Sequence, residues 1–93
     1  MANLGFFELS STDGEYVKLS ELTELTFTKD TKYSMQIYKN SANLYLCISE
    51  TKPTEGGFYF ESGEKFSVTP VSDSEYIWVN VVGSGKCELN IAS

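Results

Sequence analysis

The 93-residue sequence predicts an all-β fold, a two-sheet antiparallel β-sandwich of the jelly-roll or immunoglobulin-like kind with seven to nine short strands. Apolar and polar residues alternate with a period of two along most of the chain, which is typical of half-buried strands. Turn residues rich in Gly, Asn, Asp and Ser recur between these segments, and no convincing long helix interrupts them. The length suits one domain, which we expect to cover residues 1–93.

Each predicted strand has one apolar phase that identifies its core side. Tyr33, Met35 and Ile37 alternate with polar neighbours, and Leu44 and Leu46 do the same further along. Residues 76–82 are apolar in both phases, which favours a central strand. The expected strands are residues 4–9, 15–19, 25–28, 32–39, 44–49, 58–60, 65–69, 76–82 and 87–91.

The connections between these strands carry turn chemistry. We expect residues 1–19 to form an opening hairpin, because Asp13-Gly14 is a favoured hairpin corner. Polar segments at 40–43, 61–64 and 83–86 are likewise predicted to be hairpin corners.

Two further connections are expected to differ from hairpins. The longest break, residues 50–57, contains a proline and two glycines and is predicted to cross from one sheet to the other. One short helical or turn segment can form from Ser20 to Glu24, with Ser20 as its cap. The main part of the sandwich is expected to comprise residues 20–93.

Charge and residue usage exclude several function classes. Thirteen acidic groups against seven lysines give a net charge of -6, and without arginine this disfavours binding to a phosphate backbone. The chain has no histidine, which removes the usual general base and imidazole ligand. Cys47 and Cys87 lie too far apart in sequence to form a zinc motif. We therefore predict no enzyme activity, no cofactor and no metal site.

Some remaining features have a structural interpretation. The carboxylates of Glu61, Glu64, Asp73 and Glu75 sit at predicted turns, where they are expected to be exposed solubilising groups. The N-terminus has no basic and apolar leader, so we expect a soluble cytoplasmic product with two free, largely buried thiols.

Aromatic residues are abundant: six Tyr, six Phe and one Trp. Core packing accounts for most of them, whereas tyrosines in the phase opposite the core are suited to a protein interface. The core candidates are Phe6 or Phe7, Phe27, Phe60, Phe66 and Trp78. The interface candidates are Tyr38, Tyr45 and, if its ring is exposed, Trp78.

A series of motifs over residues ~20–93 resembles small structural proteins of tailed bacteriophages. It comprises Lys32-Tyr33-Ser34-Met35-Gln36-Ile37, Leu44-Tyr45-Leu46-Cys47, Lys52-Pro53-Thr54, Gly56-Gly57-Phe58, Glu61-Ser62-Gly63-Glu64-Lys65-Phe66 and Tyr76-Ile77-Trp78-Val79. The resemblance implies a virion component, first a capsid decoration or head-associated protein. Such a protein would bind the major capsid protein or another virion protein and self-associate around a symmetry axis.

Two alternatives remain open at this point. A tail or head-fibre module would bind host-surface carbohydrate by stacking exposed aromatic rings on sugars. An acidic inhibitor of a host nuclease or polymerase would form a salt-sensitive complex with a basic enzyme.

Overall fold

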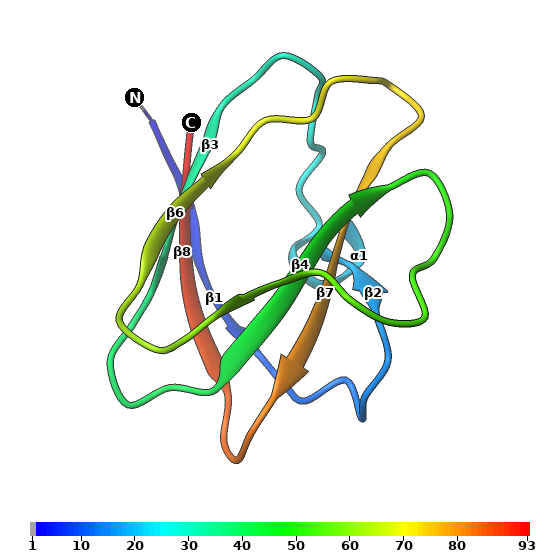
Figure 1. Cartoon of the computed structure of the whole chain (residues 1–93). Coiled ribbons are helices and arrows are strands. Elements are labelled where there is room, and N and C mark those ends of the chain that lie inside the picture. Colours follow the sequence, from blue (N-terminus) through cyan, green and yellow to red (C-terminus); the bar gives the residue numbers. More distant parts are fainter. Residues whose placement is uncertain (1) are drawn as a thin grey trace.

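Eight strands form two four-stranded antiparallel sheets in the computed structural model, which describes residues 2–93 (Figure 1). Sheet A has the order β1-β8-β3-β6 and sheet B has the order β2-β7-β4-β5. The predicted β-sandwich is therefore confirmed. The elements are β1 (Asn3–Leu9), β2 (Val17–Lys18), α1 (Leu19–Thr23), β3 (Tyr33–Ile37), β4 (Asn43–Ser49), β5 (Phe58–Phe60), β6 (Lys65–Val68), β7 (Tyr76–Val82) and β8 (Cys87–Ala92).

The strand pairs show which kind of sandwich this is. β1 pairs with β8, β2 with β7, β3 with β6 and β4 with β5. This is the pattern of one long two-stranded ribbon, with its tip between β4 and β5, rolled up so that β3 also pairs with β8 and β4 with β7. The fold is a jelly roll, the first of the two predicted alternatives.

The predicted hairpins are wrong. β1 lies in sheet A and β2 in sheet B, so residues 2–19 form no opening hairpin, and Met1 lies outside the described residues. The corners at 40–43, 61–64 and 83–86 also pass from one sheet to the other. Residues 50–57, predicted to cross between the sheets, instead connect two paired strands of sheet B.

Contacts between the corners explain this difference. The Ala42 N–H donates to the Lys86 carbonyl oxygen at 3.0 Å, and the Gly63 N–H donates to the Ile37 carbonyl oxygen at 2.9 Å. The first bond joins two corners, and the second joins a corner to the end of β3 in sheet A. Gly and polar residues suit both kinds of corner, so the partner strand is chosen by burial and not by the turn.

The expected strand at residues 25–28 is absent. The Thr28 N–H donates to the Tyr33 hydroxyl at 2.8 Å, and the Phe27 ring meets the Tyr33 ring edge-on at 4.9 Å. Side-chain contacts thus replace a strand partner along this segment. The short helix was predicted, but Lys18 and not Ser20 is at its N-cap, and it makes no side-chain capping bond there.

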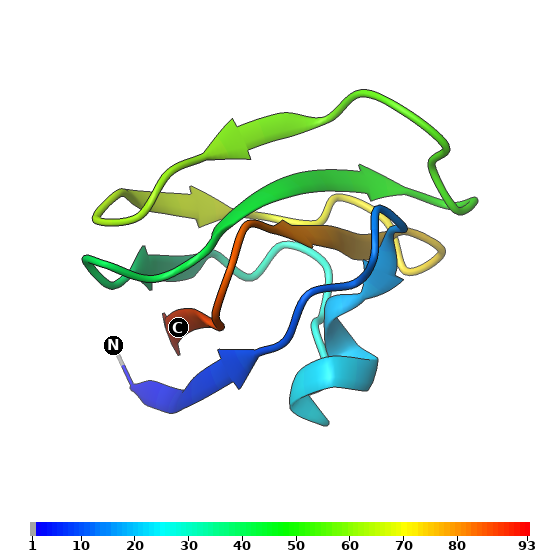
Figure 2. The same ribbon diagram turned by 90° about the horizontal axis from the view of Figure 1, so that it is seen from below.

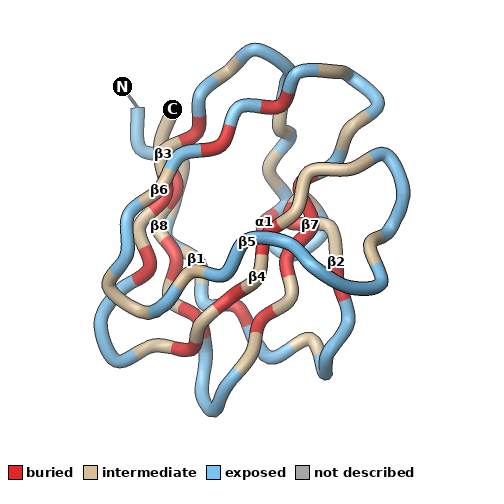
Figure 3. Tube along the Cα trace, viewed as in Figure 1, coloured by how far each residue is buried: buried red, intermediate tan, exposed pale blue. Residues whose placement is uncertain are grey.

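The core lies between the two sheets, where buried residues alternate with more exposed ones along β3 and β8 (Figure 3). The predicted core phase is confirmed for Tyr33, Met35 and Ile37, all 3% exposed or less. In β8, Cys87, Leu89 and Ile91 are fully buried beside them. Phe7, Phe27, Phe60 and Phe66 pack against this core as partly buried side chains. The Phe60 and Phe66 rings stack with centroids 3.9 Å apart, joining the edge strands β5 and β6.

The two ends of the described chain lie beside each other (Figures 1 and 2). The Ser93 N–H donates to the Ala2 carbonyl oxygen at 2.8 Å, which extends the β1–β8 pairing to the terminus. Within residues 2–93, no helix has the length and apolar character needed to span a bilayer.

Candidate binding surfaces

The strand alternation gives each sheet an outer face that points away from the core. Tyr38 follows β3 and belongs to the outer face of sheet A. Tyr45 of β4 and Trp78 of β7 lie on the outer face of sheet B, opposite Asn80 and Cys47 respectively. The structure therefore brings Tyr45 and Trp78 to one face and places Tyr38 on the other side of the sandwich.

Two exposed aromatic rings meet on the outer face of sheet A. Phe6 is 44% exposed and Tyr38 is 45% exposed, and their ring centroids are 5.0 Å apart at an angle of 58°. Their strands flank β8, so the rings meet above it. Phe6 was predicted only as one of two core alternatives. A β-bulge at the start of β1 and its pairing with β8 direct Phe7 inward and Phe6 outward.

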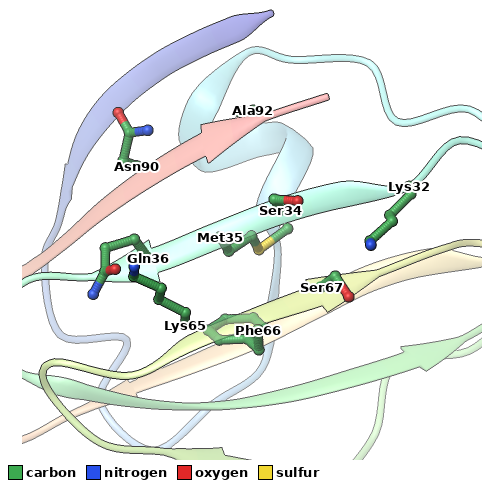
Figure 4. A pocket seen from close by; sticks show the side chains of 9 residues that line it. All are labelled: Lys32, Ser34, Met35, Gln36, Lys65, Phe66, Ser67, Asn90 and Ala92. Carbon is green, nitrogen blue, oxygen red and sulfur yellow. The ribbon is translucent and has the colours of Figure 1, made fainter. Parts of the chain in front are cut away.

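A shallow hollow of about 390 Å³ lies on the same outer face (Figure 4). It adjoins the aromatic pair, because Asn90, which lines it, is the β8 partner of Phe6. Its floor is a row of small residues, Ala92, Ser34 and Ser67, placed side by side by the β8–β3–β6 register. Lys32 and Lys65 project at its margins (Figure 4). We call it the lysine hollow. Small side chains between longer ones create the depression, a feature that the strand alternation alone does not reveal.

The polar groups of the lysine hollow leave particular atoms free. Gln36 uses its Nε2 to donate to the carbonyl oxygens of Ile37 at 2.8 Å and Gly63 at 3.2 Å. Among residues 2–93, the ion pair found joins Lys52 and Glu15, so neither lysine of the hollow is neutralised by a salt bridge. The hollow consequently offers two ammonium groups and two serine hydroxyls to an approaching carboxylate.

The outer face of sheet B is also aromatic, but part of it is covered. The Trp78 side chain is only 7% exposed, and its Nε1 donates to the Ser49 carbonyl oxygen at 3.0 Å. Tyr76 meets it edge-on at 6.0 Å, and the Lys18 Nζ lies 3.8 Å from the Tyr76 ring centroid. Trp78 therefore has little ring surface left for a partner. Tyr45 is half-buried and its ring centroid is 4.8 Å from that of Tyr59.

Among residues 2–93, burial raises the pKa of the Tyr16 hydroxyl and of the Cys87 thiol. The pKa of the Cys87 thiol rises to about 11, which keeps it protonated at neutral pH. Cys47 and Cys87 are both free thiols, as predicted. Glu61, Glu64 and Asp73 are exposed, as predicted, whereas Glu75 is half-buried and accepts the Val71 N–H at 3.2 Å. Across residues 2–93 no cluster of Cys, Asp and Glu is close enough to hold a metal ion.

Comparison with known proteins leaves the chain unassigned. No family model matches it, and no curated protein or solved structure gives a significant match. The resemblance to phage structural proteins therefore stays a prediction.

Proposed function

We propose that this chain is a non-enzymatic structural protein of a bacteriophage particle, a capsid decoration protein that binds the major capsid protein through the outer face of sheet A. One observation carries the choice of face. The exposed Phe6–Tyr38 pair lies next to the lysine hollow, so an apolar anchor and unpaired positive charge adjoin on one surface. Exposed aromatic rings are suited to anchor an interface, and charge beside them can orient a partner.

The aromatic pair provides the anchor. Phe and Tyr bring a large contact area with few rotatable bonds, so that ordering them on binding costs little conformational entropy. Phe6 and Tyr38 already contact each other in the free protein. A partner side chain placed on them would complete the burial of both rings.

Charge determines the orientation of the partner. Glu8 and Glu88 are paired across β1 and β8 on one side of the rings, whereas Lys65 projects on the other. A partner with an acidic side chain at the lysine hollow and a basic group near the glutamates matches this polarity, and the reversed arrangement is penalised by like-charge repulsion. The surface therefore favours a single docking orientation.

The architecture is consistent with this role. Jelly rolls occur widely in viral capsid domains, an analogy at the level of the fold alone. The net charge of -6 repels nucleic acid, which suits a protein on the outside of a DNA-filled shell.

The first test is particle composition. Particles produced by the genome that encodes the chain are purified on a density gradient, and the ratio of the chain to the major shell protein is measured by mass spectrometry. We expect a fixed ratio with high copy number. A chain abundant in the lysate but missing from the particles would refute the proposal.

The second test concerns the face. Phe6→Ser combined with Tyr38→Ser should reduce particle occupancy at limiting concentration by about 30-fold, since an interface hot spot contributes about 2 kcal/mol or more. Tyr59→Ser is the matched control, because Tyr59 is 43% exposed but lies in sheet B. A loss of occupancy with the control and none with the double variant would show that sheet B docks, and would refute the choice of sheet A.

The charge of the hollow is tested separately. Lys65→Glu should weaken occupancy and reduce its dependence on salt, whereas Lys86→Glu, an exposed lysine in the 83–86 corner, should leave both unchanged. Equal effects of the two variants would show that net charge, and not the hollow, controls binding.

A further inference from the structure

A walled notch of about 260 Å³ lies on the outer face of sheet B, opposite the proposed docking face. Its base is the strand surface of β4 and β7, and its wall is the loop of residues 50–57. The residues around it come from four separate parts of the chain. Those used below are Tyr45, Asn80, Thr54, Glu55 and Gly56, with Tyr16 on the boundary.

The wall of the notch is held in place before any ligand arrives. The Tyr16 hydroxyl donates to the Gly56 carbonyl oxygen, and the Lys52 Nζ lies 3.3 Å from Glu15 Oε2, tying the loop to the turn before β2. Gly57 has a φ of +102°, and a Cβ there would meet the Tyr16 hydroxyl and lie 3.0 Å from the Leu46 carbonyl oxygen. Gly57 thus lies close against the sheet, and these two ties hold the exposed loop in place, so little order has to be imposed on binding.

The hydrogen-bonding groups of the notch have a defined orientation. Thr12 Oγ1 accepts the Val81 N–H at 3.1 Å and donates to Asn80 Oδ1 at 3.0 Å. This fixes the amide of Asn80 and leaves its Nδ2 as a donor. Within residues 2–93, that Nδ2 and the Glu55 carboxylate have no hydrogen-bond partner, and neither does the Tyr45 hydroxyl.

We propose that this notch binds a neutral pyranose sugar. A sugar ring has an apolar C–H face, which suits the Tyr45 ring, and a rim of hydroxyls that need both donors and acceptors. Asn80 supplies a donor and Glu55 supplies an acceptor at the same opening. Since the Glu55 carboxylate lies at the notch, an anionic sugar is repelled.

The neighbouring surface extends the site. A second hollow of about 280 Å³, lined by Glu15, Lys52 and Pro53 among others, shares Tyr16, Gly14 and Thr54 with the notch. The two together have room for a terminal sugar and the residue linked to it. Each hollow is small and open, so the Kd for one monosaccharide should be weak, on the order of 1 mM.

The sugar site does not depend on the capsid proposal, because it lies on the other sheet. If sheet A faces the shell, sheet B faces outward, where host-surface glycans are met. A protein that binds sugars but is absent from particles would retain this inference and lose the proposed function. A protein that is present in particles but binds no sugar would retain the proposed function and lose this inference.

The test is a titration of the isotope-labelled chain with methyl glycosides of neutral hexoses and N-acetylhexosamines, followed by amide and side-chain NMR shifts. At least one glycoside should cause saturable shifts centred on the Asn80 side-chain amide and the 54–57 backbone. Saturable shifts confined to the lysine hollow, or no saturable shift with any neutral glycoside at the solubility limit, would overturn the inference. N-acetylneuraminic acid and lysine amide serve as charged probes, and preferential binding of either would also overturn it.

Matched variants separate a sugar contact from a structural effect. Asn80→Asp keeps the acceptor for Thr12 and removes the donor, and Tyr45→Leu keeps apolar bulk but removes the ring. Each should raise the Kd at least about tenfold. Tyr76→Leu changes an exposed ring on the same face outside the notch and should leave the Kd unchanged. Normal Kd values for both notch variants in folded protein would refute the assigned contacts.

Discussion

Replacing Trp78 with alanine is expected to lower the free energy of unfolding by about 3 kcal/mol, although the ring lies on the outer side of its sheet. Removal of a buried Trp side chain costs about 3 to 5 kcal/mol through lost burial and the space left behind. Trp78 is only 7% exposed because Lys18 and Tyr76 cover its ring. It is not part of the central apolar cluster between the sheets. The lower end of that range therefore applies.

The effect is large enough to measure by thermal and urea unfolding. In a domain of this size 1 kcal/mol shifts the Tm by about 4 to 8 °C, so the expected decrease is about 12 to 24 °C. Far-UV circular dichroism must be the probe, because Trp78 is the single tryptophan and its removal abolishes the tryptophan fluorescence.

Two further variants divide the loss into its parts. Trp78→Phe retains most of the apolar area but leaves the Ser49 carbonyl oxygen without its 3.0 Å hydrogen bond, which should cost about 1 kcal/mol beyond the area lost. Tyr76→Ala removes a ring that is 40% exposed and should cost about 1 kcal/mol or less. A loss below about 1 kcal/mol for Trp78→Ala, with an unchanged m-value, would show that the ring is an exposed platform and would refute the reasoning.

Three other substitutions test separate parts of the structure. Gly57→Ala should destabilise the fold by about 1 to 3 kcal/mol and accelerate amide exchange in residues 50–57, since its φ of +102° is strained for alanine; unchanged exchange would contradict this. Tyr33→Phe should cost about 1 to 3 kcal/mol in urea unfolding, because the Thr28 N–H loses its acceptor at 2.8 Å. Burial raises the Cys87 pKa from 9.0 to about 11, so above pH 9 the unfolded chain releases a proton that the folded chain keeps. Stability should therefore fall as the pH rises from 9 to about 11, and Cys87→Ala should lack this component; parallel pH curves for the two proteins would exclude it.

Which residues face the core could be predicted from the sequence, but which strands pair could not. The alternation of Tyr33, Met35 and Ile37 with polar neighbours is a local property, and those three side chains are buried as expected. The corner at 83–86 has the same Gly and Ser residues whether β8 folds back on β7 or crosses to sheet A. That choice depends on apolar surfaces distant in sequence, so the hairpin predictions failed there.

The candidate binding surfaces could likewise be predicted only in part from the sequence. Alternation alone placed Tyr38 and Tyr45 outside the core, because the period of a strand assigns each side chain to a face. It could not show that Phe6 stacks on Tyr38, that the two predicted tyrosines lie on opposite sheets, or that Lys18 and Tyr76 cover Trp78.

The sequence by itself determined the all-β class, the core phase of most strands and the absence of histidine and arginine chemistry, because these follow from residue type and local period. Only the tertiary structure decided the jelly-roll order, the pairing of Phe6 with Tyr38, the lysine hollow and the notch beside Tyr45. Each of these joins side chains from strands or loops that are far apart in the chain, and their proximity arises from how the two sheets bury their apolar faces together.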